Sequence, residues 1–493
     1  GCRIFKLERN YRSTQNIVNA ANSLIHKNTK QIPKTVYSEK EEGSKVSICS
    51  SYSDYEEGYA VAGKINDMRM QNYDYADFAI LYRTNAQSRI LEEALRKRGI
   101  PYKIYGGLSF YQRKEVKDVI SYLRLIVNPH DEEAFKRVIN YPARGIGDTT
   151  LNKLVVAATD HNVSLWTVLN DPIGYALPVN NGTAKKLSDF RELISGFIER
   201  NIKLSAEEIA AAVVKESGIV STLFQDRSVE GISKQENLQE LLKGIAEFCE
   251  IRREEGTEHV SLADFLSEVS LLTDQDNDKE EQANKVTMMT VHAAKGLEFR
   301  NVFVVGLEED LFPSAMSKDN PRAVEEERRL FYVAITRAEE NCVLTHARSR
   351  YRNGQSTMCS PSRFLKDIDP KYIYTSADAV TTDGLLATRR SSVFQQPKAM
   401  EGEAYVSPVA QAVGRQARLT RMETASLSPA PSSSSAPALS GLHVGAKVRH
   451  DRFGEGEVTA IEGEGGNAKA TVSFAHFGQK QLLLKFARLT IVE

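Results

Sequence analysis

The sequence lacks paired cysteines, a long apolar run and an excess of either charge. Its five cysteines are scattered over 493 residues without a CxxC pair. We therefore expect reduced thiols in a cytoplasmic protein and no metal site. No apolar run approaches the ~20 residues of a membrane-spanning helix, so we expect no membrane partner. With 64 Lys and Arg residues against 65 Asp and Glu, any polyanion must be bound by local basic patches.

A complete phosphate-binding loop is also missing. Such a loop reads G-x-x-x-x-G-K-[ST], follows a strand, and ends in a hydroxyl that binds Mg²⁺. The nearest match, "GYAVAGKI" from Gly58 to Ile65, ends in an apolar side chain. It also lies inside an amphipathic helical stretch at 54–71. We interpret it as a chance match.

Strand-like apolar runs alternate with amphipathic helices in two parts of the chain, residues 1–107 and 284–372. This alternation predicts a parallel sheet flanked by helices. Residues 108–283, between the two parts, are almost entirely helical in pattern. The sequence therefore predicts one α/β domain interrupted by a helical insertion. The expected strands are residues 45–50, 77–83, 102–106, 285–292, 301–307 and 341–347.

After about residue 372 this pattern fades. Residues 373–440 are rich in Ser, Ala, Pro, Gln and Thr, a composition typical of a disordered linker. Short β-rich runs broken by glycines follow in residues 441–493. They predict a small barrel of SH3-like size.

A charged residue continues the apolar stripe near residue 330. In "RRLFYVAITRAEENCVL" (328–344), Leu330, Val333 and Ala334 recur at helical spacing, and the next position on that stripe is Arg337. Its guanidinium has two interpretations. It caps the carbonyls at the end of the helix, or it is presented to a phosphate, which its planar fork binds well. The spacing alone leaves both open.

Two further stretches place polar residues at the ends of predicted elements. In "LERNYRSTQ" (7–15), the pair Tyr11 and Arg12 precedes Ser13, a candidate N-cap for the next helix. In "TVHAAKGLEF" (290–299), a turn of small residues joins two apolar strands. Ligands of open α/β sheets collect at loops beyond the strand ends. The polar residues of this turn are His292, Lys295 and Glu298, with Gly296 between them.

In this order along the chain, the three stretches resemble motifs IV, V and VI of the UvrD/PcrA/Rep DNA helicases of superfamily 1, with the PcrA branch nearest. The resemblance runs from residue 1 to about 372, and the terminal barrel resembles the Tudor-like domain of that branch. It implies that residues 1–107 and 284–372 form a RecA-like motor domain (2A). Residues 108–283 would be its 2B insertion.

The resemblance also implies a nucleotide site. Tyr11 would stack on the adenine of ATP, Arg12 would reach the γ-phosphate, and Glu298 in "KGLEF", beside Gly296, would accept a hydrogen bond from the ribose. Arg337 would be an arginine finger, which contributes ~10³–10⁵ in rate in this chemistry. ATP and Mg²⁺ would be bound mainly by a first motor domain that this chain lacks. We therefore expect the chain alone to hydrolyse no ATP.

DNA contacts follow from the same resemblance, each with a simpler alternative. "LYRTNAQSR" (81–89) suits the phosphates of a single strand, or it is a helix cap beside a surface arginine. His292 would link DNA to the nucleotide site, or it is a structural histidine. "ARGIGDTT" (143–150) would grip duplex DNA, with Asp148 or Thr149 capping the next helix, or it is a plain helix–helix turn. The expected DNA contacts are Arg83, Thr84, Asn85, His292, Gly145, Gly147 and Thr149.

The function implied is the C-terminal part of an ATP-dependent 3′→5′ DNA helicase or translocase in DNA repair or replication. Its partners would be single-stranded DNA and junctions of single- and double-stranded DNA. The alternative is a motor-less adaptor that binds DNA, with a barrel that docks RNA polymerase. A helicase–nuclease fusion is disfavoured because a serine-rich stretch and a small barrel stand where a nuclease domain would follow.

Overall fold

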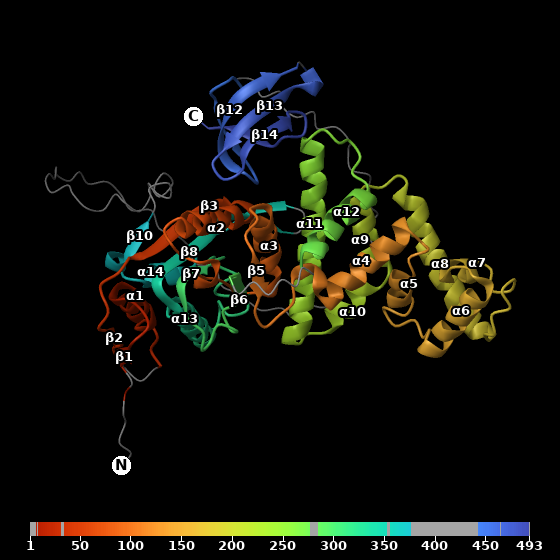
Figure 1. Cartoon of the computed structure of the whole chain (residues 1–493), viewed down its shortest axis with the longest axis horizontal. Coiled ribbons are helices and arrows are strands. Elements are labelled where there is room, and N and C mark those ends of the chain that lie inside the picture. The colour runs from red at the N-terminus through yellow and green to blue at the C-terminus, as the bar shows by residue number, and fades with distance from the viewer. Residues whose placement is uncertain are drawn as a thin grey trace, which may run out of the picture.

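The computed structural model describes residues 6, 8–30, 34–276, 284–352, 355–375, 442–463 and 465–492. Most of the predicted linker therefore lies outside the described residues, as do the end of the predicted insertion and residues 441 and 493 of the predicted barrel. Figure 1 places a sheet with its helices beside a helical insertion, and a small β domain above the junction of the two.

The central sheet has the strand order β10–β3–β8–β7–β4–β6–β5, and every pair along this path is parallel. Strand β9 pairs in antiparallel orientation with the end of β8. Strand β4 lies between β6 and β7, so the segments before and after the insertion form one sheet together. The predicted α/β fold with a parallel sheet is confirmed. The strands are β3 (Val46–Ser53), β4 (Phe78–Tyr82), β5 (Tyr102–Ile104), β6 (Val286–Thr290), β7 (Phe299–Val304), β8 (Ala338–Arg352), β9 (Gln355–Met358) and β10 (Ile373–Thr375).

Helices cover both faces of the sheet. Successive side chains of a strand point to opposite faces. In β4, Phe78, Ile80 and Tyr82 therefore pack on the side of α2 and α3, while Ala79 and Leu81 pack on the side of α1 and α13. The helices of this domain are α1 (Gln15–Ile25), α2 (Asp54–Arg69), α3 (Ser88–Lys97), α13 (Pro321–Ile335) and α14 (Arg363–Asp367). A short parallel pair, β1 (Arg9–Asn10) and β2 (Tyr37–Ser38), lies on either side of α1 in the sequence.

The glycine-rich match that we rejected as a phosphate loop lies within α2. Gly58 faces α3, where an added Cβ would stand 3.0 Å from the Cγ2 atom of Ile90. The glycine therefore permits close helix packing. Its interpretation as a chance match is confirmed.

The insertion leaves the sheet after β5 and returns at β6, and it has a hydrophobic core of its own. Among the described residues its longest helix is α11, which contacts the barrel and the short 3₁₀ helix η2 (Asn85–Gln87) after β4. Its helices are α4 (Lys114–Val127), α5 (Glu132–Val138), α6 (Asp148–His161), α7 (Leu165–Asn170), α8 (Asn181–Asn201), α9 (Ala206–Glu216), α10 (Ile219–Gln225), α11 (Val229–Glu254) and α12 (Leu262–Asp276).

The C-terminal domain is an antiparallel five-stranded sheet in the order β14–β13–β12–β11–β15, which we call the barrel. Val448, Val458 and Val472 are buried in it, and the SH3- or Tudor-like prediction is confirmed. No helix among the described residues is long and apolar enough to cross a membrane. The strands are β11 (Lys447–His450), β12 (Gly454–Glu462), β13 (Lys469–Phe474), β14 (Gly478–Leu483) and β15 (Leu489–Ile491).

The last strand of the central sheet differs from the expectation. Residues 373–375, which the composition assigned to the linker, form β10 and pair in parallel with β3. A strand of three residues is too short to show a period of two in the sequence. The exact domain boundaries otherwise stay a prediction.

Candidate functional site

The predicted site residues lie at two opposite edges of the central sheet. Glu298 and Arg337 stand directly before β7 and β8, at the amino ends of the strands. Arg83 and His292 follow β4 and β6, at the carboxyl ends. Because all these strands are parallel, the two groups are separated by the length of a strand. We call them the amino-edge cluster (Tyr11, Arg12, Glu298 and Arg337) and the carboxyl-edge cluster (Arg83, His292 and Glu327).

Arg337 follows the end of helix α13. Its Nε donates a hydrogen bond to the carbonyl of Val333 at 3.1 Å, and its other nitrogens donate to the Leu297 carbonyl at 3.0 Å and the Thr336 hydroxyl at 3.3 Å. The simpler interpretation of Arg337 as a helix-end cation is therefore realised. A guanidinium carries five N–H donors, so donors remain for another acceptor. Of the expected apolar stripe, only Ala334 is fully buried, while Leu330 and Val333 are half-buried.

Arg12 reaches the same place from the start of the chain. Its Nε donates to the carboxylate of Glu298, and a terminal nitrogen lies 3.4 Å from the carbonyl of Thr336. The hydrogen bond and charge of Arg12 hold the pKa of Glu298 below its usual value, and Arg337 lowers it further. Burial lowers the pKa of Arg337, and so does the charge of Arg12. Glu298 is thus paired with Arg12, and the charge of Arg337 also acts on it.

Tyr11 directly precedes Arg12 in the sequence, and Gly296 lies two residues before Glu298. The ring of Tyr11 is 71% exposed, and the guanidinium of Arg9 stands 4.5 Å from its centre. Such an exposed ring is free to stack on a planar group. Gly296 has a φ of +91° with no atom within 4 Å of an added Cβ, so the backbone conformation, not crowding, favours glycine there.

The start of helix α1, shortly after Arg12, is held by bonds to main-chain carbonyls. Ser13 is not the N-cap of α1, because its hydroxyl donates to the carbonyl of Ala338 at 2.6 Å. Thr14 is the N-cap, and its side chain makes no capping bond. The carbonyls of Glu41 and Glu42 instead accept bonds from the first N–H groups of α1, at 3.0 and 2.9 Å. This bracing was not predicted, because its acceptors are main-chain atoms.

Lys40 is a cation of the amino-edge cluster that the sequence did not single out. Its ammonium donates to the carbonyl of Arg12, and its charge also acts on Glu298. The signal was weak, because an isolated lysine in a polar stretch is common on surfaces.

At the carboxyl edge, Arg83 is engaged by α13. It forms two bonds with the carboxylate of Glu327, at 3.0 and 2.6 Å. The amides of Arg83 and Thr84 both donate to the side-chain oxygen of Gln87 at 2.9 Å, which fixes the turn after β4. The carbonyl of Asn85 accepts a bond from Arg113 of the insertion at 2.9 Å. These residues therefore lie where the α/β domain and the insertion meet.

His292 lies beside the pair of Arg83 and Glu327. Burial lowers the pKa of its imidazole, the charge of Arg83 lowers it further, and Glu327 opposes the shift. We expect His292 to be neutral at pH 7 and to titrate below its ordinary pKa of 6.5. Because the unfolded chain then binds more protons, this group makes stability fall as pH drops below about 6.5.

Proton NMR titration of the imidazole tests this, with the resonance assigned through His292→Gln. Arg83→Met is expected to raise the pKa of His292, and Glu327→Gln to lower it. Identical titration in all three proteins would show that the three side chains do not lie together in solution.

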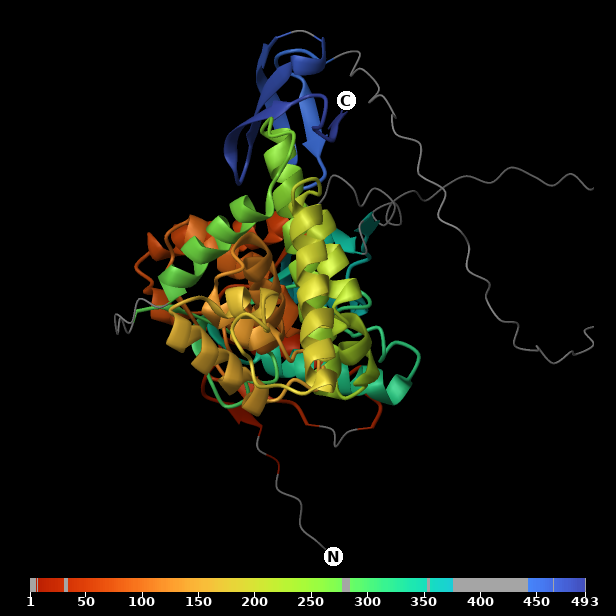
Figure 2. The ribbon, with the colours of Figure 1, turned by 90° about the vertical axis from the view of Figure 1, so that its right-hand side faces the viewer.

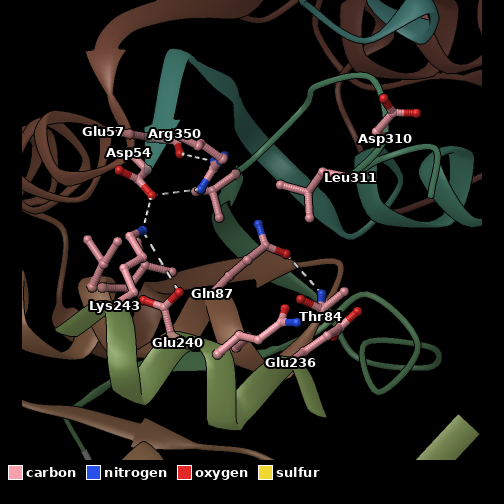
Figure 3. Close-up of a pocket in the computed structure, with 15 residues that line it drawn as sticks. Asp54, Glu57, Thr84, Gln87, Glu236, Glu240, Lys243, Asp310, Leu311 and Arg350 are labelled. Atoms are coloured by element: carbon pink, nitrogen blue, oxygen red, sulfur yellow. Dashed lines mark hydrogen bonds and ion pairs between the residues drawn. The ribbon is translucent and has the colours of Figure 1, made fainter. Parts of the chain in front are cut away.

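A cavity of about 350 Å³ lies beside the carboxyl-edge cluster, between α2, α3 and α11. Figure 3 shows side chains of these helices pointing into it, with Lys243 between Asp54 and Glu240. Acidic side chains outnumber basic ones in its lining. Burial raises the pKa of Glu236, another lining residue, and Arg83 opposes that shift.

The structure does not bring the "GIG" turn to either cluster. Gly145, Gly147 and Thr149 are exposed at the start of α6, which Figure 1 places at the end of the insertion away from the sheet. The predicted cap is wrong: Gly147 is the N-cap, with no side-chain bond, and neither Asp148 nor Thr149 takes that place. Gly145 has a φ of +71°, and its carbonyl accepts a bond from Lys186 at 3.1 Å.

Two elements join the clusters. The segment 291–298 runs from the carboxyl end of β6 to the amino end of β7, with Val291 and Ala294 buried against the face of α1 and α13. Helix α13 spans the same face, carrying Glu327 near one edge and ending before Arg337 at the other. Packed elements therefore connect the two edges of the sheet. Among the described residues, no group of three or more His, Cys, Asp or Glu side chains is placed to hold a metal ion.

Comparison with known proteins identifies the chain. Residues 5–349, more than half of it, match the UvrD-like helicase C-terminal domain, and residues 444–490 match the PcrA/UvrD tudor domain. The chain is 35% identical over 492 residues to DNA helicase II of Escherichia coli K12, covering 100% of this chain and 62% of that protein. It is 37% identical over 487 residues to the ATP-dependent DNA helicase PcrA of Staphylococcus aureus NCTC 8325, covering 98% and 61%.

The chain thus spans about three fifths of the length of these relatives. A solved structure described as the C-terminal domain of a possible DNA helicase from a Lactobacillus overlaps 23% of this chain and 62% of its own. Its identity is 21% and its TM-score 0.15, too low to bear on the fold. The two domain matches and the relatives agree with the architecture above. The chain belongs to the UvrD-like helicase C-terminal domain family.

Proposed function

We propose that this chain is the nucleotide-sensing and DNA-binding part of an ATP-dependent DNA helicase that moves 3′→5′ along a single strand. The observation that carries the proposal is the pairing of Arg12 with Glu298 within the electrostatic reach of Arg337, together with the exposed Tyr11 that precedes Arg12. Two guanidiniums against one carboxylate leave an excess of positive charge, which suits the phosphates of a nucleotide.

The residues of the amino-edge cluster have distinct proposed roles. Tyr11 stacks on the adenine, Glu298 accepts a hydrogen bond from the ribose, and Gly296 shapes the turn beside it. Arg12 and Arg337 bind the γ-phosphate, for which Arg12 gives up its present bond to Glu298. Positioned positive charge of this kind is the main source of catalysis in phosphoryl transfer. Mg²⁺ is proposed to be held mainly by a first motor lobe outside this chain.

The carboxyl-edge cluster is proposed to bind the DNA strand. Arg83, Thr84 and Asn85 contact phosphates and sugars. When a DNA strand is bound, His292 shifts, and segment 291–298 passes this shift to Glu298. Because Arg83 is paired with Glu327, it binds phosphate through its remaining N–H donors or after release by movement of α13. In either case, closure of the protein around ATP at the amino edge changes how tightly the carboxyl edge binds DNA.

The insertion and the barrel are proposed to bind further partners. Gly145, Gly147 and Thr149 are exposed at the N-terminus of α6, where free N–H groups suit a phosphate of duplex DNA. The whole protein is then expected at junctions of single- and double-stranded DNA. RNA polymerase is the proposed partner of the barrel, and a pull-down that fails for both the barrel and the whole protein would remove that partner.

A comparison of two proteins tests the proposal: the chain alone, and the full-length protein in which a phosphate-loop motor lobe precedes it. We expect DNA-stimulated ATP hydrolysis from the full-length protein only, and unwinding of a duplex with a 3′ tail but not of one with a 5′ tail. DNA-stimulated hydrolysis by the chain alone would contradict the assigned roles. A full-length protein that binds DNA but hydrolyses no ATP would instead support the motor-less adaptor.

A further inference from the structure

The barrel contacts both the motor domain and the insertion. Figures 1 and 2 both place it above the end of α11, and its strands also touch α2 and β3. Residues 376–441 join it to β10. At ~3.3 Å per extended residue, a stretch of this length lets the barrel lie elsewhere. The barrel is therefore held in place by its own contacts.

Aromatic side chains make the contact with α2. The ring of Phe477 stacks on Tyr55 with centres 5.4 Å apart and lies 4.5 Å from Tyr59. Phe453 packs against Tyr55 at 6.2 Å. The hydroxyl of Ser53, the N-cap of α2, donates to the carbonyl of Arg452 at 2.5 Å. One continuous apolar cluster thus spans the motor domain and the barrel.

Charged side chains make the contact with α11. Arg452 and Arg488 of the barrel bind the carboxylate of Glu250 at 2.5 and 3.0 Å. His450 lies 3.0 Å from Glu254, and both side chains are almost fully buried. The Nδ1 atom of His450 accepts bonds from the amides of Arg452 and Phe453. The other ring nitrogen therefore carries the hydrogen that is donated to Glu254.

The two contacts meet at the start of α2. Asp54 follows Ser53 and forms an ion pair with Lys243 of α11, and Tyr55 then enters the aromatic contact. The barrel is therefore seated on a junction that motor and insertion build together. If α11 moved away from α2, the barrel could keep only one of its two contacts.

We propose that the barrel is an intramolecular strap. Its docking face, made of Phe453, Phe477, His450, Arg452 and Arg488, recognises the aromatic start of α2 and the acidic end of α11 as a pair. It thereby holds the insertion in one position on the motor domain. This role is independent of the nucleotide chemistry proposed above. The docking face therefore binds two aromatic rings at the start of one helix together with carboxylates at the end of another.

Amide hydrogen exchange of the intact chain tests the strap. It compares Arg452→Glu with a double variant in which the two charges of the ion pair are exchanged. In Arg452→Glu we expect exchange about tenfold faster than in the native chain at the first turn of α2 and the last turn of α11. The double variant Arg452→Glu/Glu250→Arg restores this ion pair in reverse and is expected to recover part of the protection, because Arg488 and Glu254 then face like charges. Lys485→Glu, an exposed charge change in the barrel, is the matched control and should change nothing at either helix end.

The amides of β12 and β13 report in the same experiment whether the barrel stays folded. Native protection at both helix ends in Arg452→Glu, with β12 and β13 still protected, would overturn the proposal. If β12 and β13 lose protection, the exposed variant Arg488→Glu decides, because its side chain can leave Glu250 without opening the barrel. Unchanged helix ends in that variant would then count against the strap.

Discussion

Replacing Arg337 by alanine in the full-length protein is expected to lower the kcat of DNA-stimulated ATP hydrolysis about 10³-fold, the lower range for loss of an arginine finger. The KM for ATP should change far less, because the proposed contact with the phosphate is made mainly when charge develops on the transferred group. Steady-state kinetics at saturating DNA measure both constants. The matched control is Arg322→Ala, an exposed arginine at the other end of α13, which should leave both unchanged.

Arg337→Lys separates the two roles that the structure allows. Lysine keeps a positive charge near the end of α13 but loses the planar fork. Arg337→Lys should therefore keep the end of the helix stable, and its ATP turnover should lie between those of Arg337→Ala and the native protein. The loss of capping bonds in Arg337→Ala costs about 1 kcal/mol of stability, too little to unfold the domain. If Arg337→Ala kept ATP turnover within tenfold of the native value, Arg337 would be a helix cap and nothing more.

The sequence predicted the elements whose hydrophobic pattern is local. β4 and β6 carry apolar runs between polar turns, and both were placed within about two residues of their true ends. Strand β10 was missed because its three residues are ordered by pairing with β3, more than 300 positions away. For the same reason the bonds from the start of α1 to the carbonyls of Glu41 and Glu42 left no trace in residue types.

The candidate site shows the same division between local and distant information. Tyr11, Arg12, Glu298 and Arg337 were singled out through the resemblance of their stretches to helicase motifs, and their roles stay a proposal. The partners of site residues were not singled out, since Arg83 and Glu327 lie 244 positions apart and meet only once the sheet and α13 are packed. Which edge of the sheet holds each cluster also depended on the strand order, which periodicity does not give.

A buried ion network holds β8 to α2, and Arg350 is its centre. The guanidinium binds Glu308 and Glu57, at 2.8 and 2.9 Å for one nitrogen, and lies 3.5 Å from Asp54. Figure 3 shows Arg350 beside Asp54, which in turn meets Lys243 of the insertion. Glu308 has no exposed surface. A carboxylate in such a place is costly unless a cation stays beside it.

Arg350→Ala is therefore expected to destabilise the α/β domain by about 3–5 kcal/mol, the usual cost of removing one partner of a buried pair. Guanidinium unfolding followed by far-ultraviolet circular dichroism measures the loss. Trp166, the single tryptophan, lies in α7 within the core of the insertion, so its fluorescence follows the insertion separately and should shift less. Arg363→Ala is the control, because its pair with Glu309 is partly exposed and should cost under about 1 kcal/mol.

The loss of unfolding free energy in Arg350→Ala should also depend on pH, in a direction that follows from the pKa of Glu57. Burial already raises the pKa of Glu57 in the native protein, against the opposing charge of Arg350. Without that charge the pKa of Glu57 rises further, and the folded variant binds protons that the unfolded chain releases. Stability of the variant must then fall as pH rises above the ordinary range of a glutamate. The loss relative to the native chain is therefore smaller at pH 5 than at pH 8, whereas a loss that came from packing alone would be equal at both.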